Sequence, residues 1–130
     1  MAKSISKLKK ELDKYFSLFI RLKNADDLGF TKCYTSGRYY HYKKIHAGHF
    51  MSRKHLATRW CEINVQPQSA ADNLFGQGEQ FKFGKNLDAE YGEGTAEKLQ
   101  IKARQTLKLS RVDYEEKISY YKEAVKNLKK

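Results

Sequence analysis

Residues 46–73 read HAGHFMSRKHLATRWCEINVQPQSAADN, and the expected fold depends on this stretch. Ile63 and Val65 alternate with polar neighbours, which predicts a short β-strand over Glu62–Gln66. Pro67, the only proline of the chain, is expected to end that strand because it has no N–H to donate to a ladder.

The segments on either side continue this pattern. Between Phe30 and Phe50 the sequence becomes rich in aromatic and β-branched residues around a Thr-Ser-Gly turn, which predicts a strand through Tyr39, Tyr40 and Tyr42. Residues 52–60 are expected to form a loop or a single helical turn. Residues 69–75 are expected to form a helix capped by the serine at its start and interrupted by the glycines that follow.

Both ends of the chain have the periodicity of amphipathic helices. The first is expected from Ser4 to about Lys23, and a later one from Thr95 to about Leu109, with Ser110 starting the last helix. That last helix either packs on its own domain or forms a coiled-coil dimer. In both cases the contact face is a heptad-like stripe of Tyr114, Ile118, Tyr121, Val125 and Leu128.

The 130 residues fit a single α+β domain with an N-terminal helix over 1–29, a mixed core over 30–93 and C-terminal helices over 94–130. No apolar run reaches the length of a membrane span and no signal-peptide pattern begins the chain, so a cytoplasmic protein without a membrane partner is expected. Two cysteines are too few for a disulfide framework.

The net charge of +11 favours a polyanionic partner, and the charge is concentrated. Residues 31–60 hold seven bases, no acid and all four histidines, interleaved with tyrosines. This composition suits a surface that binds the phosphates of DNA, although a solvated basic face over a tyrosine-rich strand is the alternative. The DNA-binding candidates are Arg38, Lys43, Lys44, Arg53, Lys54, His55 and Arg59.

The stretch contains several short motifs: Ala47-Gly48-His49-Phe50, Ser52-Arg53-Lys54-His55, Thr58-Arg59-Trp60, Asn64-Val65-Gln66-Pro67-Gln68 and Asn73. Together they resemble the NinG/Rap recombination endonucleases of lambdoid phages, which belong to the wider HNH or ββα-metal nucleases. Downstream, Gly84, Leu87-Asp88, Tyr91-Gly92 and Leu99 are similar to the segment that follows the motifs in that family.

This resemblance implies a small ββα-metal (HNH-like) core that clasps one divalent cation, Mg²⁺ or Mn²⁺, and hydrolyses phosphodiester bonds in duplex or branched DNA. In that family His49 corresponds to the general base and Asn64 to the residue that holds the loop and orients the base. Asn73 corresponds to a metal ligand at the start of the helix.

The sequence departs from the family pattern at the sites of a structural zinc. Many relatives have two C-x-x-C motifs where this chain has Cys33-Tyr34-Thr35-Ser36 and Ser69-Ala70-Ala71-Asp72, so no structural zinc is expected. Hydrophobic packing should hold the fold instead, around Phe30, Tyr40, Phe50, Trp60 and Val65.

A second departure concerns the catalytic ion. Gly48 stands where many HNH sites have a metal-binding Asp or His, so a ligand must come from elsewhere. His46, Asp72, Asp88 and Glu90 are the candidates, with His46 and Asp72 expected beside Asn73.

Two other functions fit the same residues. The first is a DNA-binding recombination accessory protein that does not cleave. It is suggested by the missing zinc-binding cysteines and by Gly48, which replaces the usual metal ligand before His49. An RNA-binding basic protein is the second, although no RNP-like or GXXG signature supports it. The sequence is also compatible with a homodimer, because symmetric cleavage of a DNA junction benefits from two active sites.

Overall fold

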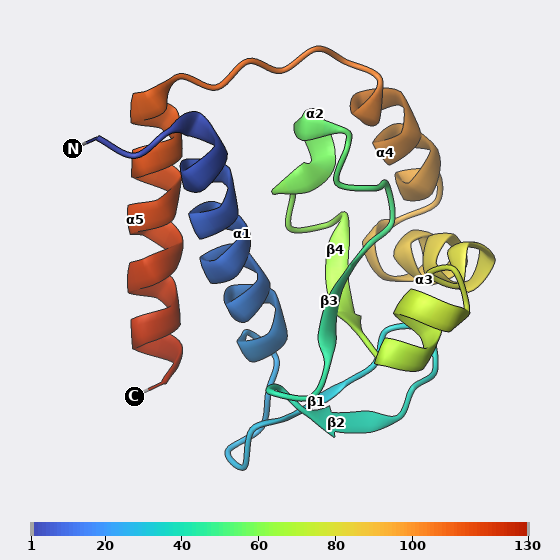
Figure 1. The fold of residues 1–130 in the computed structure, drawn as a ribbon. Helices are drawn as coiled ribbons and strands as arrows, with labels where there is room; N and C mark the ends of the chain where they lie inside the picture. Colours follow the sequence, from blue (N-terminus) through green and yellow to red (C-terminus); the bar gives the residue numbers. More distant parts are fainter. Residues whose placement is uncertain (1, 130) are drawn as a thin grey trace.

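The computed structural model describes residues 2–129 and confirms the α+β class (Figure 1). Two small antiparallel sheets lie among helices near both ends of the chain. In chain order the elements are α1 (Ile5–Leu22), β1 (Phe30–Lys32), β2 (Tyr39–His41), β3 (His46–His49), α2 (Leu56–Arg59), β4 (Val65–Gln68), η1 (Ala71–Phe75), α3 (Gln80–Tyr91), α4 (Thr95–Ala103) and α5 (Arg111–Leu128).

The central unit is the antiparallel pair β3–β4, followed directly by the short π-helix η1. The single helical turn α2 lies in the connection between the strands, as expected for residues 52–60. The helix after β4 was also expected: the Ser69 hydroxyl accepts the N–H of Asp72 at 3.2 Å, although η1 begins at Ala71. The strand pair is thus followed directly by a short helix.

The prediction that Pro67 ends its strand was wrong, because Pro67 lies inside β4 opposite Ala47. Phe50 donates its N–H to the Asn64 carbonyl at 2.8 Å, so these two residues form a hydrogen-bonded pair of the ladder. In an antiparallel ladder hydrogen-bonded and non-hydrogen-bonded pairs alternate, and the register therefore makes Ala47 and Pro67 a non-hydrogen-bonded pair. The missing N–H therefore costs no bond to β3. On the opposite side the Pro67 carbonyl accepts the N–H of Tyr34 at 2.8 Å.

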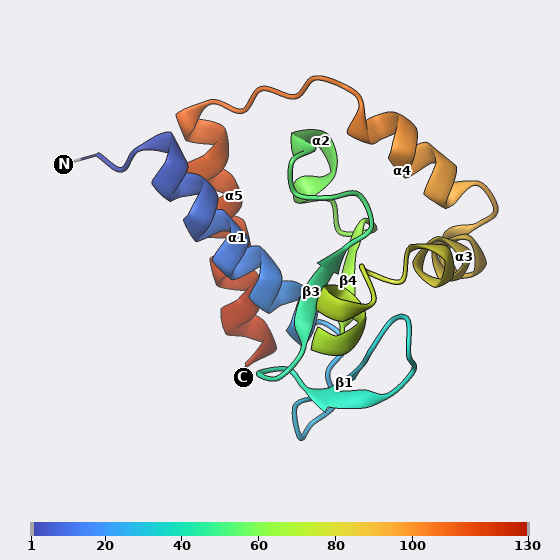
Figure 2. The same ribbon diagram turned by 45° about the vertical axis from the view of Figure 1, so that its right-hand side comes forward.

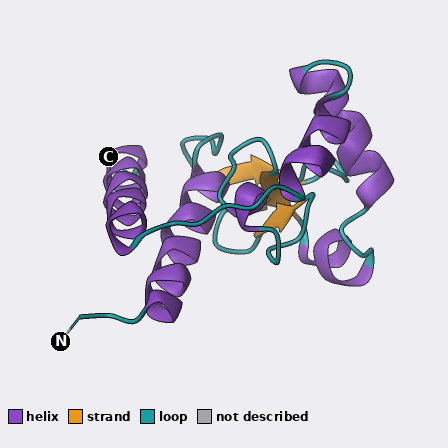
Figure 3. Ribbon diagram, turned by 90° about the horizontal axis from the view of Figure 1, so that it is seen from above, coloured by secondary structure: helices purple, strands orange, loops and turns teal. Residues whose placement is uncertain are grey.

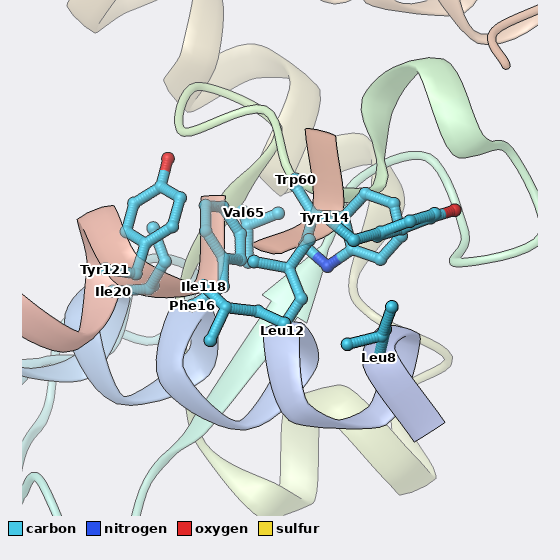
Figure 4. Packing of buried hydrophobic residues seen from close by; sticks show 9 residues of the cluster. All are labelled: Leu8, Leu12, Phe16, Ile20, Trp60, Val65, Tyr114, Ile118 and Tyr121. Carbon is cyan, nitrogen blue, oxygen red and sulfur yellow. The ribbon is translucent and has the colours of Figure 1, made fainter. Parts of the chain in front are cut away.

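Helix α1 packs on one face of β3–β4, and α5 lies side by side with α1 (Figures 1 and 2). Their shared cluster includes Trp60 and Val65, so the expected burial of these two residues is confirmed (Figure 4). The helical residues of the cluster are Leu8, Leu12, Phe16, Ile20, Tyr114, Ile118 and Tyr121. The stripe on α5 is therefore occupied within the chain, which favours packing on its own domain over a coiled-coil dimer.

A second cluster lies on the other side of the strands, where α3 and α4 pack (Figures 2 and 3). Phe50, Phe83, Leu87 and Leu99 form it. Gly84 packs closely here, because a Cβ at this position would lie 3.2 Å from the ring of Phe50, which is tighter than an ordinary contact. The sequence reading missed α3 altogether, since the glycines at 76, 78 and 84 obscured its period.

Three further expectations need correction. The strand over the tyrosines is Tyr39–His41, while Tyr42 lies in the following turn. Phe30 is 41 % exposed and Tyr40 is half-buried, so neither anchors the core. Helix α4 begins after Gly94 rather than at a Thr95 cap, and it ends at Ala103 instead of about residue 109.

The ends of the other helices agree with the sequence. Ser4 caps α1 by accepting the N–H of Lys7. Ser110 and Asp113 form a reciprocal capping box at the start of α5. No helix within residues 2–129 is long and apolar enough to cross a membrane.

Candidate active site

A cleft of about 690 Å³ opens between α1, the strand β3 and η1. The segment before β3 and the loop after it complete the walls. The polar side chains that line the cleft include Asp13, Arg21, Lys43, His46, His49, Arg53 and Asn73. His49 and Asn73, which the sequence predicted to share a site, thus meet at one cleft although 24 positions separate them.

His49 is the last residue of β3, and its ring is fixed by the backbone of the following loop. Its Nε2 lies 3.0 Å from the carbonyl oxygen of Arg59. Because a carbonyl only accepts, Nε2 carries the proton in the neutral ring and Nδ1 carries the lone pair. Nδ1 is then the ring atom that can take up a proton.

The protonation state of His49 also suits a base. Burial lowers its pKa below the usual histidine value. The Arg59 carbonyl and Asp13 oppose this shift, whereas the positive charge of Arg53 adds to it. The net direction is downward, so the imidazole is neutral at neutral pH.

Asn64 lies fully buried just before β4 and ties together the loop that carries α2. Its Oδ1 accepts the N–H of Met51 at 2.8 Å, and its Nδ2 donates to the carbonyls of Met51 and Thr58, both at 3.0 Å. None of the hydrogen bonds of the Asn64 side chain goes to His49. Asn64 positions the loop segments next to His49 and next to the Arg59 carbonyl that holds the ring.

Asn73 on η1 and His46 on β3 contact each other directly, since Asn73 Nδ2 lies 3.0 Å from His46 Nδ1. An imidazole nitrogen and an amide group therefore converge at the cleft. With Asn73 Oδ1 and an imidazole nitrogen as ligands, this pair could hold a divalent cation whose other positions are filled by water and phosphate oxygens, as is common for Mg²⁺. Asp13 is the only carboxylate among the described residues that line the cleft, and it is bound to Arg59.

The other candidate metal ligands lie elsewhere. Asp72 points away from the cleft and accepts the hydroxyl of Thr35 at 2.6 Å. Asp88 accepts a backbone N–H at the start of α4, and Glu90 accepts a tyrosine hydroxyl. The expectation that Asp72 shares a site with His46 and Asn73 is corrected accordingly.

The seven predicted DNA-binding residues divide into three groups. Lys43 and Arg53 are exposed and line the cleft. Arg38, Lys44 and Lys54 are exposed outside it, and His55 is half-buried at the start of α2. Arg59 is not free to bind phosphate, because Asp13 holds its guanidinium.

Two cleft residues on α1 were not foreseen. Asp13 bonds to Arg59 and to the indole N–H of Trp60. Arg21 donates to the Tyr42 carbonyl at 2.8 Å, and burial lowers its pKa. Both looked like ordinary polar positions of an amphipathic helix, and only the packing of α1 on β3 brings them to the site.

The residues in place of the two C-x-x-C motifs meet in one buried polar cluster. The Cys33 sulfur accepts the N–H groups of Ser36 at 3.4 Å and Ser69 at 3.2 Å, and it lies 3.9 Å from the carboxylate of Asp72. Burial raises the pKa of the Cys33 thiol, but these hydrogen bonds lower it more, to about 7. Hydrogen bonds thus join the two segments.

The fold and the cleft define a small basic α+β protein in which a strand pair and a following helix bring two histidines and an amide together. A family model described as Bacteriophage Lambda NinG protein matches residues 1–130. The chain therefore belongs to the NinG family. Comparison with curated proteins and with solved structures gave no match.

Proposed function

We propose that this NinG-family chain is a metal-dependent DNA endonuclease of the HNH type that acts in phage recombination, on duplex or branched DNA. The observation that carries the proposal is His49: a half-buried imidazole on the cleft whose Nε2 lies 3.0 Å from a backbone carbonyl and whose pKa is lowered by burial. A neutral imidazole held in one orientation is the arrangement that a general base needs.

In this mechanism His49 Nδ1 accepts a proton from the water that attacks the scissile phosphate. The Arg59 carbonyl fixes the ring, and Asn64 positions the loop that supplies this carbonyl. His46 and Asn73 would hold the cation. When bound, a divalent ion supplies Lewis-acid polarisation of the phosphate and stabilises the leaving oxygen.

The charges around the cleft support a phosphate ligand. Arg21, Lys43 and Arg53 line the cleft together with one acid, Asp13. Asp13 pairs with Arg59 at 2.6 Å and also lies 4.0 Å from Arg53, so it is shared between two arginines, and among the described residues Arg21 and Lys43 have no carboxylate partner on the cleft wall. A phosphodiester in the cleft would be stabilised by charge-assisted contacts to them.

Nicking of supercoiled plasmid and of synthetic branched DNA, with Mg²⁺ or Mn²⁺ and with EDTA, tests the proposal. Wild type should cut only with the metal, and His49→Ala should lose at least about a hundredfold in rate while still binding DNA. His41→Asn is the matched control, because His41 is a histidine of β2, in the other sheet, and does not line the cleft. Metal-independent cutting, or full activity of His49→Ala, would contradict the assignment.

A non-cleaving DNA-binding role is the second candidate function. It is favoured by one observation: within residues 2–129, no three His, Cys, Asp or Glu side chains are grouped to hold a metal. The same assay separates the two functions. DNA binding without metal-dependent cutting in wild type would leave the accessory role.

A further inference from the structure

Two phenylalanines at the two ends of the connection between η1 and α3 are almost fully exposed to solvent. Phe75 ends η1 and is 86 % exposed, and Phe81 near the start of α3 is 83 % exposed. Leu74, which lines the cleft, is 60 % exposed. Such a concentration of large apolar side chains on a short segment is costly in water and marks an interaction surface.

The connection between the two phenylalanines is held by hydrogen bonds of its own. Gly78 donates its N–H to the Asp72 carbonyl at 2.8 Å, and its carbonyl accepts from the buried Gln68 amide at 2.8 Å. Gln77 and Glu79 adopt left-handed backbone angles, with φ of 54° and 47°. The main chain and a buried glutamine therefore define the shape of the connection, and the two rings are left uncovered.

The charges nearby indicate what covers the rings. Arg21, Lys43 and Arg53 line the cleft that Leu74 borders, so a polyanionic backbone is the complementary occupant. A nucleic-acid strand held there by its phosphates would bring its bases toward the cleft rim. Aromatic rings stack on unpaired bases of any sequence, because every base has a π-face. A second copy of this chain is a poorer occupant, since both copies would carry a net charge of +11.

We propose that Phe75 and Phe81 stack on unpaired bases of the nucleic acid whose backbone lies in the cleft, and that they give the protein its preference for DNA with interrupted base pairing. This inference rests on the proposed DNA-binding function but not on cleavage. The two rings determine specificity, whereas the cationic residues of the cleft supply affinity that is common to all DNA.

The test compares two DNA ligands of the same sequence in EDTA: a fully paired duplex, and the same duplex with a short single-stranded gap. Fluorescence anisotropy gives the dissociation constants, and wild type should bind the gapped form more tightly. The double variant Phe75→Ala/Phe81→Ala should lose about tenfold of that preference with its duplex affinity retained. Tyr120→Ala is the matched control, an aromatic residue of α5 that is 63 % exposed and should leave the preference unchanged.

A second measurement follows one ring directly. In Phe75→Trp, the new indole is exposed while the single native tryptophan, Trp60, is buried. Stacking on a base of gapped DNA should quench the fluorescence of the indole added in Phe75→Trp. The emission of wild type, which comes from buried Trp60, should stay nearly unchanged. Absence of quenching, or a double variant that keeps the full preference, would overturn the inference.

The remaining outcomes are also decisive. Equal affinity of wild type for both ligands would overturn the inference. So would a dimer in light scattering that the double variant disrupts without any change in DNA preference, because the patch would then be a self-association surface. A wild type that prefers the gapped DNA through these rings but never cuts would support the inference while contradicting the proposed nuclease activity.

Discussion

The carboxylate of Asp13 on α1 accepts two hydrogen bonds from the guanidinium of Arg59 at the end of α2. Oδ2 lies 2.6 Å from Nη2, and Oδ1 lies 3.2 Å from Nε. The same Oδ1 accepts the indole N–H of Trp60 at 3.0 Å. The backbone carbonyl of Arg59 is the group that fixes the His49 ring. The N-terminal helix is thereby coupled to the orientation of the candidate base.

Asp13→Ala should lower the free energy of unfolding by about 3 kcal/mol, because it leaves the mostly buried Arg59 guanidinium without its partner. Chemical denaturation measures this change. Glu11→Ala is the matched control on the same helix: it removes the ion pair with Lys3, whose side chain is largely exposed, and should cost less than about 1 kcal/mol. Equal losses in the two variants would contradict a structural role for the Asp13 pair.

Asn64→Ala should be one of the most destabilising substitutions in the chain. It removes three side-chain hydrogen bonds and leaves backbone groups of Met51 and Thr58 unpaired, at a cost of about 2 to 4 kcal/mol. Thermal or chemical unfolding measures the loss, with the exposed Asn127→Ala on α5 as control.

If Asn64 also positions the base, a second readout should change. The imidazole signals of His49 in NMR should shift or broaden in Asn64→Ala, while those of His41 stay as in wild type. A folded Asn64→Ala protein with unaltered His49 signals would limit Asn64 to a structural role.

The terminal helices could be predicted from the sequence because local rules govern them. The apolar period of α1 and the Ser110 capping box of α5 are visible in short windows, and the structure has both. The start of α4 was misjudged because Gly94 takes the cap position in a left-handed conformation. Tertiary packing on the Phe50 ring, not local period, explains why a glycine lies inside α3.

The candidate site was predictable only in part. The pairing of His49 with Asn73 came from the resemblance and agrees with the shared cleft. The role of Asp13 was not visible, since its partner Arg59 lies 46 positions away. Asp72 accepts a hydrogen bond from the hydroxyl of Thr35, 37 positions away, and no local sequence pattern predicts this contact.

The side chain of Gln68 on β4 occupies the space that a side chain at Gly48 on β3 would need. A Cβ at this position would lie 2.1 Å from Oε1 and 2.8 Å from Cβ of the fully buried Gln68. Gly48→Ala should therefore destabilise the protein by about 1 to 3 kcal/mol. In a Gln68→Ala background the same change should cost less, because the clash with Oε1 is gone while the close contact with Cβ of residue 68 remains. A double-mutant cycle by chemical denaturation measures the coupling, and strict additivity would contradict the steric explanation.

The lowered pKa of His49 makes stability depend on pH in a defined direction. Below the unfolded-state pKa of about 6.5 the unfolded chain binds a proton that folded His49 resists, so the native state loses stability as pH falls from that value toward the folded pKa. Above about 6.5 the contribution is constant.

His49→Gln removes this titration. The melting temperature of wild type, compared with that of His49→Gln, should therefore fall when the pH is lowered from neutral to mildly acidic. NMR titration of His49 should give a pKa below that of an unfolded-chain histidine. A pKa at or above that value, with a pH-independent difference in melting temperature, would show that the ring is not held as a neutral base.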